Sequence, residues 1–103
     1  MRVLDERVIA RFSHQHADAR RWLENWLLAA RTTAWANLQD VRRVFPAADG
    51  GVTVGSGARV TVFDVCGNRY RMVTNIVYTA QTVAILQIMT HGEYSMERWK
   101  RRY

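Results

Sequence analysis

Residue types that can cleave a phosphodiester lie close together in the second half of the sequence. Two arginines, Arg69 and Arg71, lie on one apolar stretch, and His91, Glu93 and Tyr94 follow the end of the next. Metal-independent cleavage of RNA needs a base for the 2′-hydroxyl, a cation beside the phosphate and an acid at the leaving oxygen. His91 could supply the base or the acid, the arginines the cation, and Tyr94 a proton or a stacking surface. A lone histidine at a strand end is more often structural, so these residue types alone also allow a site that only binds.

A second basic cluster lies near the C-terminal end of the sequence. Its members alternate with Trp99 and Tyr103, and they are Arg98, Lys100, Arg101 and Arg102. Basic residues with interleaved aromatics can follow a phosphate backbone and stack on bases. The alternative is a solvated, fraying terminus in which Trp99 packs on the core. We therefore treat the cluster as a candidate RNA-binding surface on a short helix or a loose tail.

Three apolar stretches predict the strands that position these side chains. Two of them flank Gly67 and Asn68, which favour a two-residue hairpin loop. Such a loop places Asp64 opposite Arg71, close enough for a cross-strand ion pair. Arg71 could therefore serve only that pair, or it could hold a phosphate with Arg69 and Asn68. The third stretch, Thr82 to Thr90, is almost continuously apolar, as expected for a central strand.

The first half of the sequence predicts the helices that pack on this sheet. The clearest pattern runs from Ala19 to Ala30, where apolar residues recur at helical spacing. Asp18 is the predicted N-cap of this helix, and Asn37 opens a shorter helix that Pro46 ends. The small residues from 47 to 57 predict a mobile connection between the helices and the strands.

Together these elements predict an α+β fold in which N-terminal helices pack on an antiparallel sheet of three to five strands. A chain of 103 residues is the length of one domain, so we expect a single domain over residues 1–103. Hydrophobic residues make up 49% of the sequence, which is enough to fill one core.

The charge balance points to an anionic partner. Fifteen Lys and Arg against nine Asp and Glu give a net charge of +6, and Lys100 is the single lysine. The guanidinium fork suits bidentate phosphate contact, although an acidic protein or an anionic membrane surface would also fit. Cys66 has no second cysteine to pair with, which favours a reducing compartment. No apolar run approaches the roughly 20 residues that span a bilayer, so we expect a cytoplasmic protein without membrane association.

We expect neither a metal nor a cofactor. His14 and His16 suggest a metal site, but the third histidine is distant and no cysteine or carboxylate cluster joins them. They are predicted to be exposed residues of a connector. The glycines between residues 50 and 57 lack the following GKS or GKT of a phosphate-binding loop.

The sequence resembles the HigB-type toxins of bacterial toxin-antitoxin modules, within the RelE-like mRNA interferase superfamily. The resemblance rests on Trp35 and on the stretches LQDVRRVFP (38–46), VFDVCGNRYRMV (62–73) and MTHGEY (89–94). Its most specific elements are Gly67-Asn68-x-x-Arg71 and Thr90-His91-x-Glu93-Tyr94. It runs through nearly the whole chain.

The resemblance implies a RelE-like domain with ribonuclease activity. Such an enzyme would cut mRNA in the ribosomal A site, inhibit translation and be neutralised by a helix-turn-helix, HigA-like antitoxin. It would meet operator DNA only through the toxin-antitoxin complex. Arg71 and His91 are the first catalytic candidates it implies, Tyr94 is the next, and Glu93 is an orienting or structural residue.

Two positions depart from the pattern of many relatives, which carry Lys or Arg in place of Leu86 and Asn in place of Asp64. The first change removes a cation from the sheet and the second adds an anion beside Arg71, so both would weaken phosphate binding. Arg69 or the C-terminal arginines could compensate. Three hypotheses therefore stand: an mRNA endonuclease, a non-catalytic RNA- or ribosome-binding module (or a weakened toxin that retains antitoxin binding), and a domain that binds an acidic protein.

Overall fold

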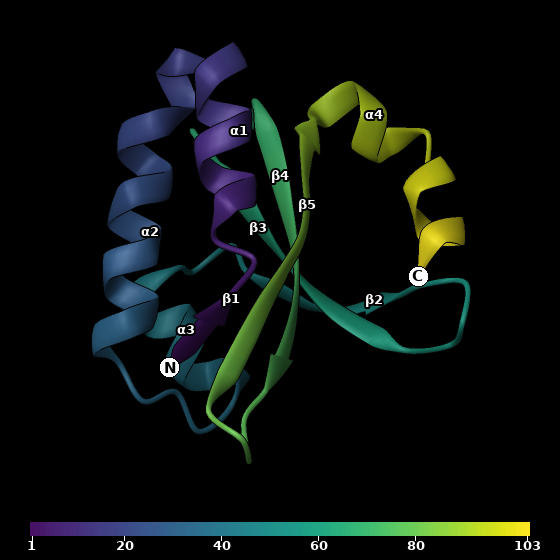
Figure 1. The fold of residues 1–103 in the computed structure, drawn as a ribbon. Coiled ribbons are helices and arrows are strands. Elements are labelled where there is room, and N and C mark those ends of the chain that lie inside the picture. Colours follow the sequence, from purple (N-terminus) through teal and green to yellow (C-terminus); the bar gives the residue numbers. More distant parts are fainter.

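A computed structural model describes residues 1–103 and has the predicted α+β architecture, with a layer of helices against a five-stranded sheet (Figure 1). In chain order the elements are β1 (Arg2–Leu4), α1 (Arg7–Gln15), the 3₁₀ helix η1 (Ala17–Ala19), α2 (Arg20–Thr32), α3 (Leu38–Val44), β2 (Asp49–Thr53), β3 (Arg59–Val65), β4 (Tyr70–Val77), β5 (Thr82–Thr90), α4 (His91–Ser95) and the 3₁₀ helix η2 (Arg98–Arg102). No helix combines the length and the apolar character needed to cross a membrane.

The sheet has the strand order β1-β5-β4-β3-β2. Strands β2 to β5 form an antiparallel meander, whereas β1 pairs with β5 in parallel, so the sheet is mixed rather than wholly antiparallel. Strand β5 lies between β1 and β4, which confirms the central position predicted for Thr82 to Thr90. A strand with neighbours on both edges and apolar contacts on both faces needs a nearly continuous apolar sequence.

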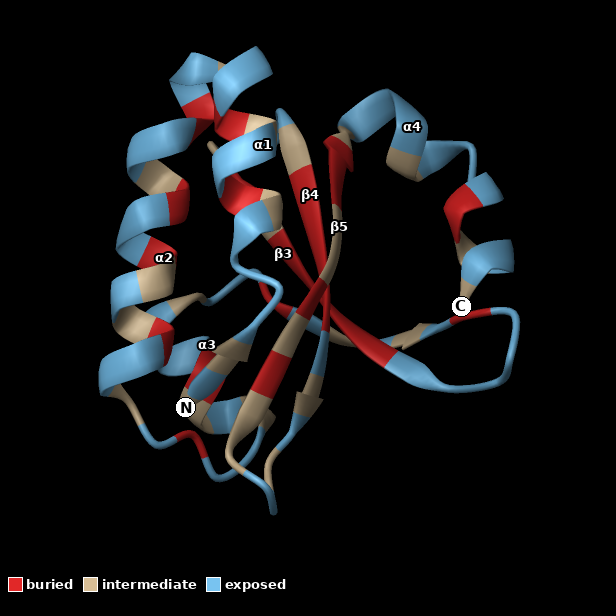
Figure 2. Ribbon diagram, viewed as in Figure 1, coloured by how far each residue is buried: buried red, intermediate tan, exposed pale blue.

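The main core lies between the helices and one face of the sheet (Figure 2). The apolar stripe of α2 supplies Leu23 and Trp26, both fully buried, and the ring of Trp26 meets that of Phe63 edge-on at 5.5 Å. Trp35, which follows α2, is also fully buried in this core. Helical spacing therefore placed Trp26 correctly in the core, whereas Trp22 is half-buried and packs against its edge.

The two predicted helix starts have different outcomes. The side chain of Asn37 accepts a hydrogen bond from the Asp40 backbone N–H at 3.0 Å, so the predicted N-cap of α3 is confirmed. The prediction for Asp18 is wrong, because it lies inside η1, and α2 begins after Ala19 without a side-chain cap. The carboxylate of Asp18 binds partners on the sheet instead, and their hydrogen bonds replace the local one.

The predicted mobile connection from residue 47 to 57 is also wrong in part, because residues 49–53 form strand β2. This strand pairs with β3 through Asp49 opposite Val62 and Thr53 opposite Arg59, with an irregularity between the two ends. Gly50 and Gly51 disfavour a strand locally, but pairing with β3 supplies the hydrogen bonds that hold them there.

The second face of the sheet carries its own apolar cluster, which the C-terminal segment (residues 91–103) covers. Trp99 is only 4% exposed and packs with residues of β3, β4 and β5, among them Val62, Val73 and Met89. In Figure 1 the segment lies on the side of the sheet away from α1 and α2. Helices on one side and the C-terminal segment on the other therefore enclose the middle of the sheet.

Candidate functional site

Arg71 lies on β4 and is held firmly by its neighbours. The predicted register is confirmed, with Asp64 opposite Arg71, and the Arg71 Nε atom lies 3.1 Å from the Asp64 carboxylate. Its Nη1 donates to the Tyr70 carbonyl oxygen at 3.0 Å, and its Nη2 donates to the Asn68 side-chain oxygen. Arg71 is only 8% exposed. A guanidinium has five N–H donors, so this one keeps donors for a phosphate while its charge is already paired.

The hairpin turn brings Asn68 to this guanidinium. Strand β3 ends at Val65 and β4 begins at Tyr70, so the turn has four unpaired residues rather than the predicted two, although the register is the predicted one. Gly67 has a φ of 68°, in the left-handed region that glycine adopts without a Cβ penalty. Glycine at this position therefore lets the chain turn so that Asn68 reaches back to Arg71.

Tyr94 completes an aromatic and cationic group around Arg71. Its ring centroid lies 5.7 Å from the Arg71 guanidinium carbon, and the ring stacks on Trp99 at 5.2 Å. The Trp99 indole N–H donates to the Tyr94 carbonyl oxygen at 3.0 Å, which fixes the two residues together. Burial raises the pKa of the Tyr94 hydroxyl, and nearby Asp49 adds to that effect. Tyr94 therefore remains protonated at neutral pH, as a proton donor must be.

His91 and Glu93 occupy the first turn of α4, directly after β5. The Thr90 hydroxyl accepts from the Glu93 backbone N–H at 3.2 Å, and the Glu93 carboxylate accepts from the Thr90 backbone N–H at 3.3 Å. This capping box makes Glu93 a structural residue of the helix start. The His91 backbone N–H donates to the Arg69 carbonyl oxygen at 3.0 Å, so the exposed His91 lies beside the hairpin that carries Arg71.

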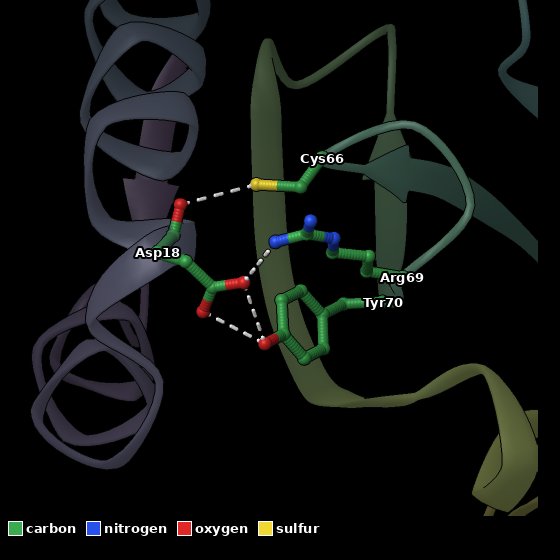
Figure 3. Close-up of polar contacts among 4 residues, drawn as sticks. All are labelled: Asp18, Cys66, Arg69 and Tyr70. Atoms are coloured by element: carbon green, nitrogen blue, oxygen red, sulfur yellow. Dashed lines mark hydrogen bonds and ion pairs between the residues drawn. The ribbon is translucent and has the colours of Figure 1, made fainter.

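Arg69 points toward Asp18 in the helical layer (Figure 3). One of its Nη atoms lies 2.8 Å from the Asp18 carboxylate, which also accepts a hydrogen bond from the Tyr70 hydroxyl at 2.8 Å. The Cys66 thiol donates to the Asp18 carbonyl oxygen. These contacts attach the β3–β4 hairpin to η1. The hydrogen bonds from Tyr70 and Arg69 lower the pKa of Asp18.

The C-terminal basic residues lie on a docked segment, not on a loose tail. Lys100 pairs with Glu97 at 2.9 Å and lies over the Trp99 ring, and its carbonyl oxygen accepts from the Gly55 backbone N–H. The Tyr103 hydroxyl donates to the Leu86 carbonyl oxygen at 3.2 Å. Three further basic side chains are exposed, namely Arg98, Arg101 and Arg102. Trp99 anchors the segment while these arginines remain free to meet an anion.

Leu86 is the extra residue of a β-bulge. Gln87 pairs with Val73 and Ile85 with Thr74, so Leu86 has no partner on β4. Its side chain is half-buried and packs at the edge of the cluster that contains Trp99. The position therefore contributes apolar packing to the face of the sheet that Trp99 covers.

The histidine pair does not assemble a ligand set. The ring of His16 stacks on Phe12 and lies edge-on to Tyr70, while His14 is exposed on α1. The structure holds no group of three or more His, Cys, Asp or Glu side chains suited to a metal ion. The sequence did not indicate that Tyr70 of the hairpin binds Asp18, because no local sequence pattern links the two residues.

A helical layer on a five-stranded sheet defines a small α+β protein consistent with a RelE-like fold. The family model described as HigB_toxin, the RelE-like toxic component of a toxin-antitoxin system, matches residues 19–97. The chain belongs to this family, and the family implies an antitoxin as its partner. No curated protein matches the chain.

Proposed function

We propose that this toxin is an endoribonuclease that cuts mRNA in the ribosomal A site and thereby inhibits translation in the cytoplasm. The observation that carries the proposal is the arrangement of Arg71, Tyr94 and His91 around one hairpin. Arg71 lies 5.7 Å from the Tyr94 ring, and the His91 main chain is bonded to the hairpin at Arg69. A cation, a protonated phenol and an exposed imidazole are the groups that cleavage through the 2′-hydroxyl requires.

Each residue has a defined task in this mechanism. His91, exposed at the start of α4, takes the proton from the attacking 2′-hydroxyl. Arg71 stabilises the charge that develops on the phosphate, using donors that Asp64 and Asn68 leave free. Tyr94 donates a proton to the leaving oxygen. Glu93 positions His91 through the capping box rather than touching RNA.

The exposed arginines of the C-terminal segment supply the long-range attraction to RNA. Arg98, Arg101 and Arg102 lie on the same segment as Tyr94, so RNA bound there runs toward the site. Arg69 contributes less than its type suggested, because Asp18 pairs with it. The partner that neutralises the toxin is proposed to be a helix-turn-helix, HigA-like antitoxin. Operator DNA is then bound only through the complex of the two proteins.

One observation favours a second candidate, a weakened toxin or a module that binds the ribosome without cutting. Asp64 places a carboxylate 3.1 Å from the Arg71 Nε atom, and Leu86 provides no cation nearby. A phosphate would approach a guanidinium whose charge is already balanced. Such a protein would keep the basic surface and antitoxin binding but would have no need of His91.

The two candidates are separated by induced expression of the wild type and of His91→Ala, with mapping of mRNA 5′ ends. His91 makes no side-chain contact that the fold needs, so the variant should remain folded. Loss of a general base lowers the rate by about 10²–10⁴-fold. We therefore expect new 5′ ends within translated messages for the wild type and their absence for the variant.

His14→Ala is the matched control, because His14 is another exposed histidine, on α1. It should cut as the wild type does. Equal growth arrest by the wild type and both variants, with no new mRNA 5′ ends, would refute the nuclease and favour the binding module.

A further inference from the structure

The carboxylate of Asp18 binds two consecutive residues at the start of β4 (Figure 3). It lies 2.8 Å from an Nη atom of Arg69, and it accepts hydrogen bonds from the Tyr70 hydroxyl, at 2.8 Å to one oxygen and 3.0 Å to the other. Because Asp18 belongs to η1, the carboxylate joins the helical layer to the hairpin. Two neighbouring partners on one carboxylate restrict how the hairpin can move relative to η1.

The main chain of the same two residues holds two members of the candidate catalytic group. The Tyr70 carbonyl oxygen accepts from Nη1 of Arg71 at 3.0 Å, and the Arg69 carbonyl oxygen accepts from the His91 backbone N–H at 3.0 Å. Successive side chains of a strand point to opposite faces, so Tyr70 reaches the helical layer while Arg71 lies on the other face. The link from Asp18 to the site therefore runs through the backbone of β4.

The turn before β4 has a strained backbone that Asp18 also contacts. Cys66 has a φ of 53° and Gly67 a φ of 68°, so two successive residues lie in the left-handed region, which is strained for a residue other than glycine. The Cys66 thiol donates to the Asp18 carbonyl oxygen at 3.3 Å. Such a conformation persists only where surrounding contacts hold it. This turn carries Asn68, whose side-chain oxygen accepts from Arg71.

The contacts of Asp18 matter more for orientation than for stability. The side chains of Arg69 and Asp18 are 68% and 40% exposed, and exposed ion pairs add little to the free energy of unfolding. Catalytic groups, in contrast, depend on surrounding hydrogen bonds that fix their geometry.

We propose that Asp18 is a positioning residue, which holds the β3–β4 hairpin in the orientation in which Arg71 and His91 act on one phosphodiester. The inference rests on the proposed ribonuclease function and adds to it a residue from the helical layer. Asp18 acts through the hairpin and does not touch the RNA.

Amide hydrogen exchange measures this positioning without any RNA. In the purified full-length protein, labelled with ¹⁵N and followed by NMR, the exchange rate of the His91 amide reports how often its bond to Arg69 opens. We expect exchange at His91 to be about tenfold faster in Asp18→Ala than in the wild type. The Gly55 amide is the internal control, because it bonds to the Lys100 carbonyl oxygen at the opposite end of β3. It should exchange equally in both proteins.

Cleavage of A-site mRNA on purified ribosomes measures the effect on the reaction. Misplacing a reacting group by about 1 Å can slow a reaction about 10²-fold, so partial loosening of the hairpin in Asp18→Ala should lower the cleavage rate at saturating protein about tenfold. The half-saturating protein concentration should not rise, because Arg69 and the C-terminal arginines keep their charge. A variant that is only less stable would do the reverse, since fewer folded molecules raise that concentration and leave the saturated rate unchanged.

Tyr70→Phe is the second variant, because it removes only the hydroxyl that binds Asp18 and keeps the ring against Phe12. It should change both measurements in the same direction but by less. Adding it to Asp18→Ala should change nothing more, since the partner of the hydroxyl is already absent. Glu24→Ala is the matched control, because it removes a carboxylate from an exposed ion pair with Arg20 on α2. It should behave as the wild type does.

The outcomes separate this inference from the proposed function. Unchanged exchange at His91, an unchanged saturated rate in Asp18→Ala, or an equal loss in Glu24→Ala would overturn the positioning role and leave the nuclease. Faster exchange at His91 in a protein that makes no cuts would refute the nuclease, and Asp18 would still be the residue that holds the hairpin. If Asp18→Ala does not fold, Tyr70→Phe decides between the same outcomes.

Discussion

Asp64→Asn is expected to increase RNA cleavage. The exchange keeps the shape of the side chain and an acceptor for the Arg71 Nε atom, now 3.1 Å from the Asp64 carboxylate, but removes the negative charge. That charge repels any phosphate that binds the free donors of Arg71. Removing this charge should therefore stabilise the transition state for cleavage, while the protein remains folded.

The size of the effect follows from Coulomb's law. A phosphate bound to Arg71 would lie about 6 Å from the Asp64 carboxylate, where the repulsion is about 0.7 kcal/mol in water and about 3 kcal/mol at an effective dielectric constant of 20. Because the Asp64 side chain is 37% exposed, the true environment lies between these limits. The predicted gain in cleavage rate is about 3-fold to 100-fold.

The gain should come with a small loss of stability. Exchanging a hydrogen bond to a charged group for a neutral one costs about 1 kcal/mol. In a domain of this size that lowers Tm by about 4–8 °C. Thermal unfolding by circular dichroism measures this loss, and cleavage of A-site mRNA on purified ribosomes, summed over all sites, measures the gain.

Asp5→Asn is the charge-matched control, because Asp5 is an exposed carboxylate distant from β3 that forms no ion pair. Asp5→Asn changes the net charge by the same amount as Asp64→Asn and should leave the cleavage rate unchanged. A folded Asp64→Asn protein whose cleavage is unchanged or lower would refute the argument that Asp64 weakens Arg71. An equal gain from Asp5→Asn would show that net charge alone is responsible.

Three further predictions concern the fold. Trp99→Ala should destabilise the protein by about 3 kcal/mol, since a buried aromatic anchor is lost; a loss below about 1 kcal/mol in chemical unfolding would show that the C-terminal segment is not anchored through it. Ser13→Ala should stabilise the protein by about 1 kcal/mol, because the Ser13 hydroxyl is buried without a hydrogen-bond partner; a lower Tm would contradict this. Asp18→Asn should lose less stability on acidification than the wild type does. Hydrogen bonds from Tyr70 and Arg69 lower the pKa of Asp18 in the folded state. The ionised carboxylate therefore stabilises the fold fully above the ordinary pKa of about 3.9, and this stabilisation is lost as the pH falls through the lower pKa of the folded state. Thermal unfolding at pH 7 and at about pH 3 tests this, and parallel curves for the two proteins would refute it.

The register of the β3–β4 hairpin could be predicted because it depends on short-range information. Alternating apolar residues on both sides of Gly67 and Asn68 fix which residues face each other, and Asp64 and Arg71 pair as expected. The α2 stripe was predictable for the same reason, since one helix turn determines which side chains share a face.

Features that depend on distant partners could not be predicted in this way. Asp18 has the sequence pattern of an N-cap, but its hydrogen bonds to Arg69 and Tyr70 cross between the two layers of the fold. Gly50 and Gly51 indicate a loop until β3 lies beside them. The sequence of the C-terminal segment allowed both a fraying tail and a docked one. Trp99 is buried against the face of the sheet away from α1 and α2, so the segment is docked.

The parallel pairing of β1 with β5 has a consequence for biosynthesis. Arg2 lies opposite Thr82, so this edge of the sheet joins residues from nearly opposite ends of the chain. Closing so long a loop is slow, and it cannot begin until β5 has been synthesised. His91, Tyr94 and Trp99 emerge from the ribosome later still. A growing chain therefore cannot assemble the candidate site before these residues have been synthesised.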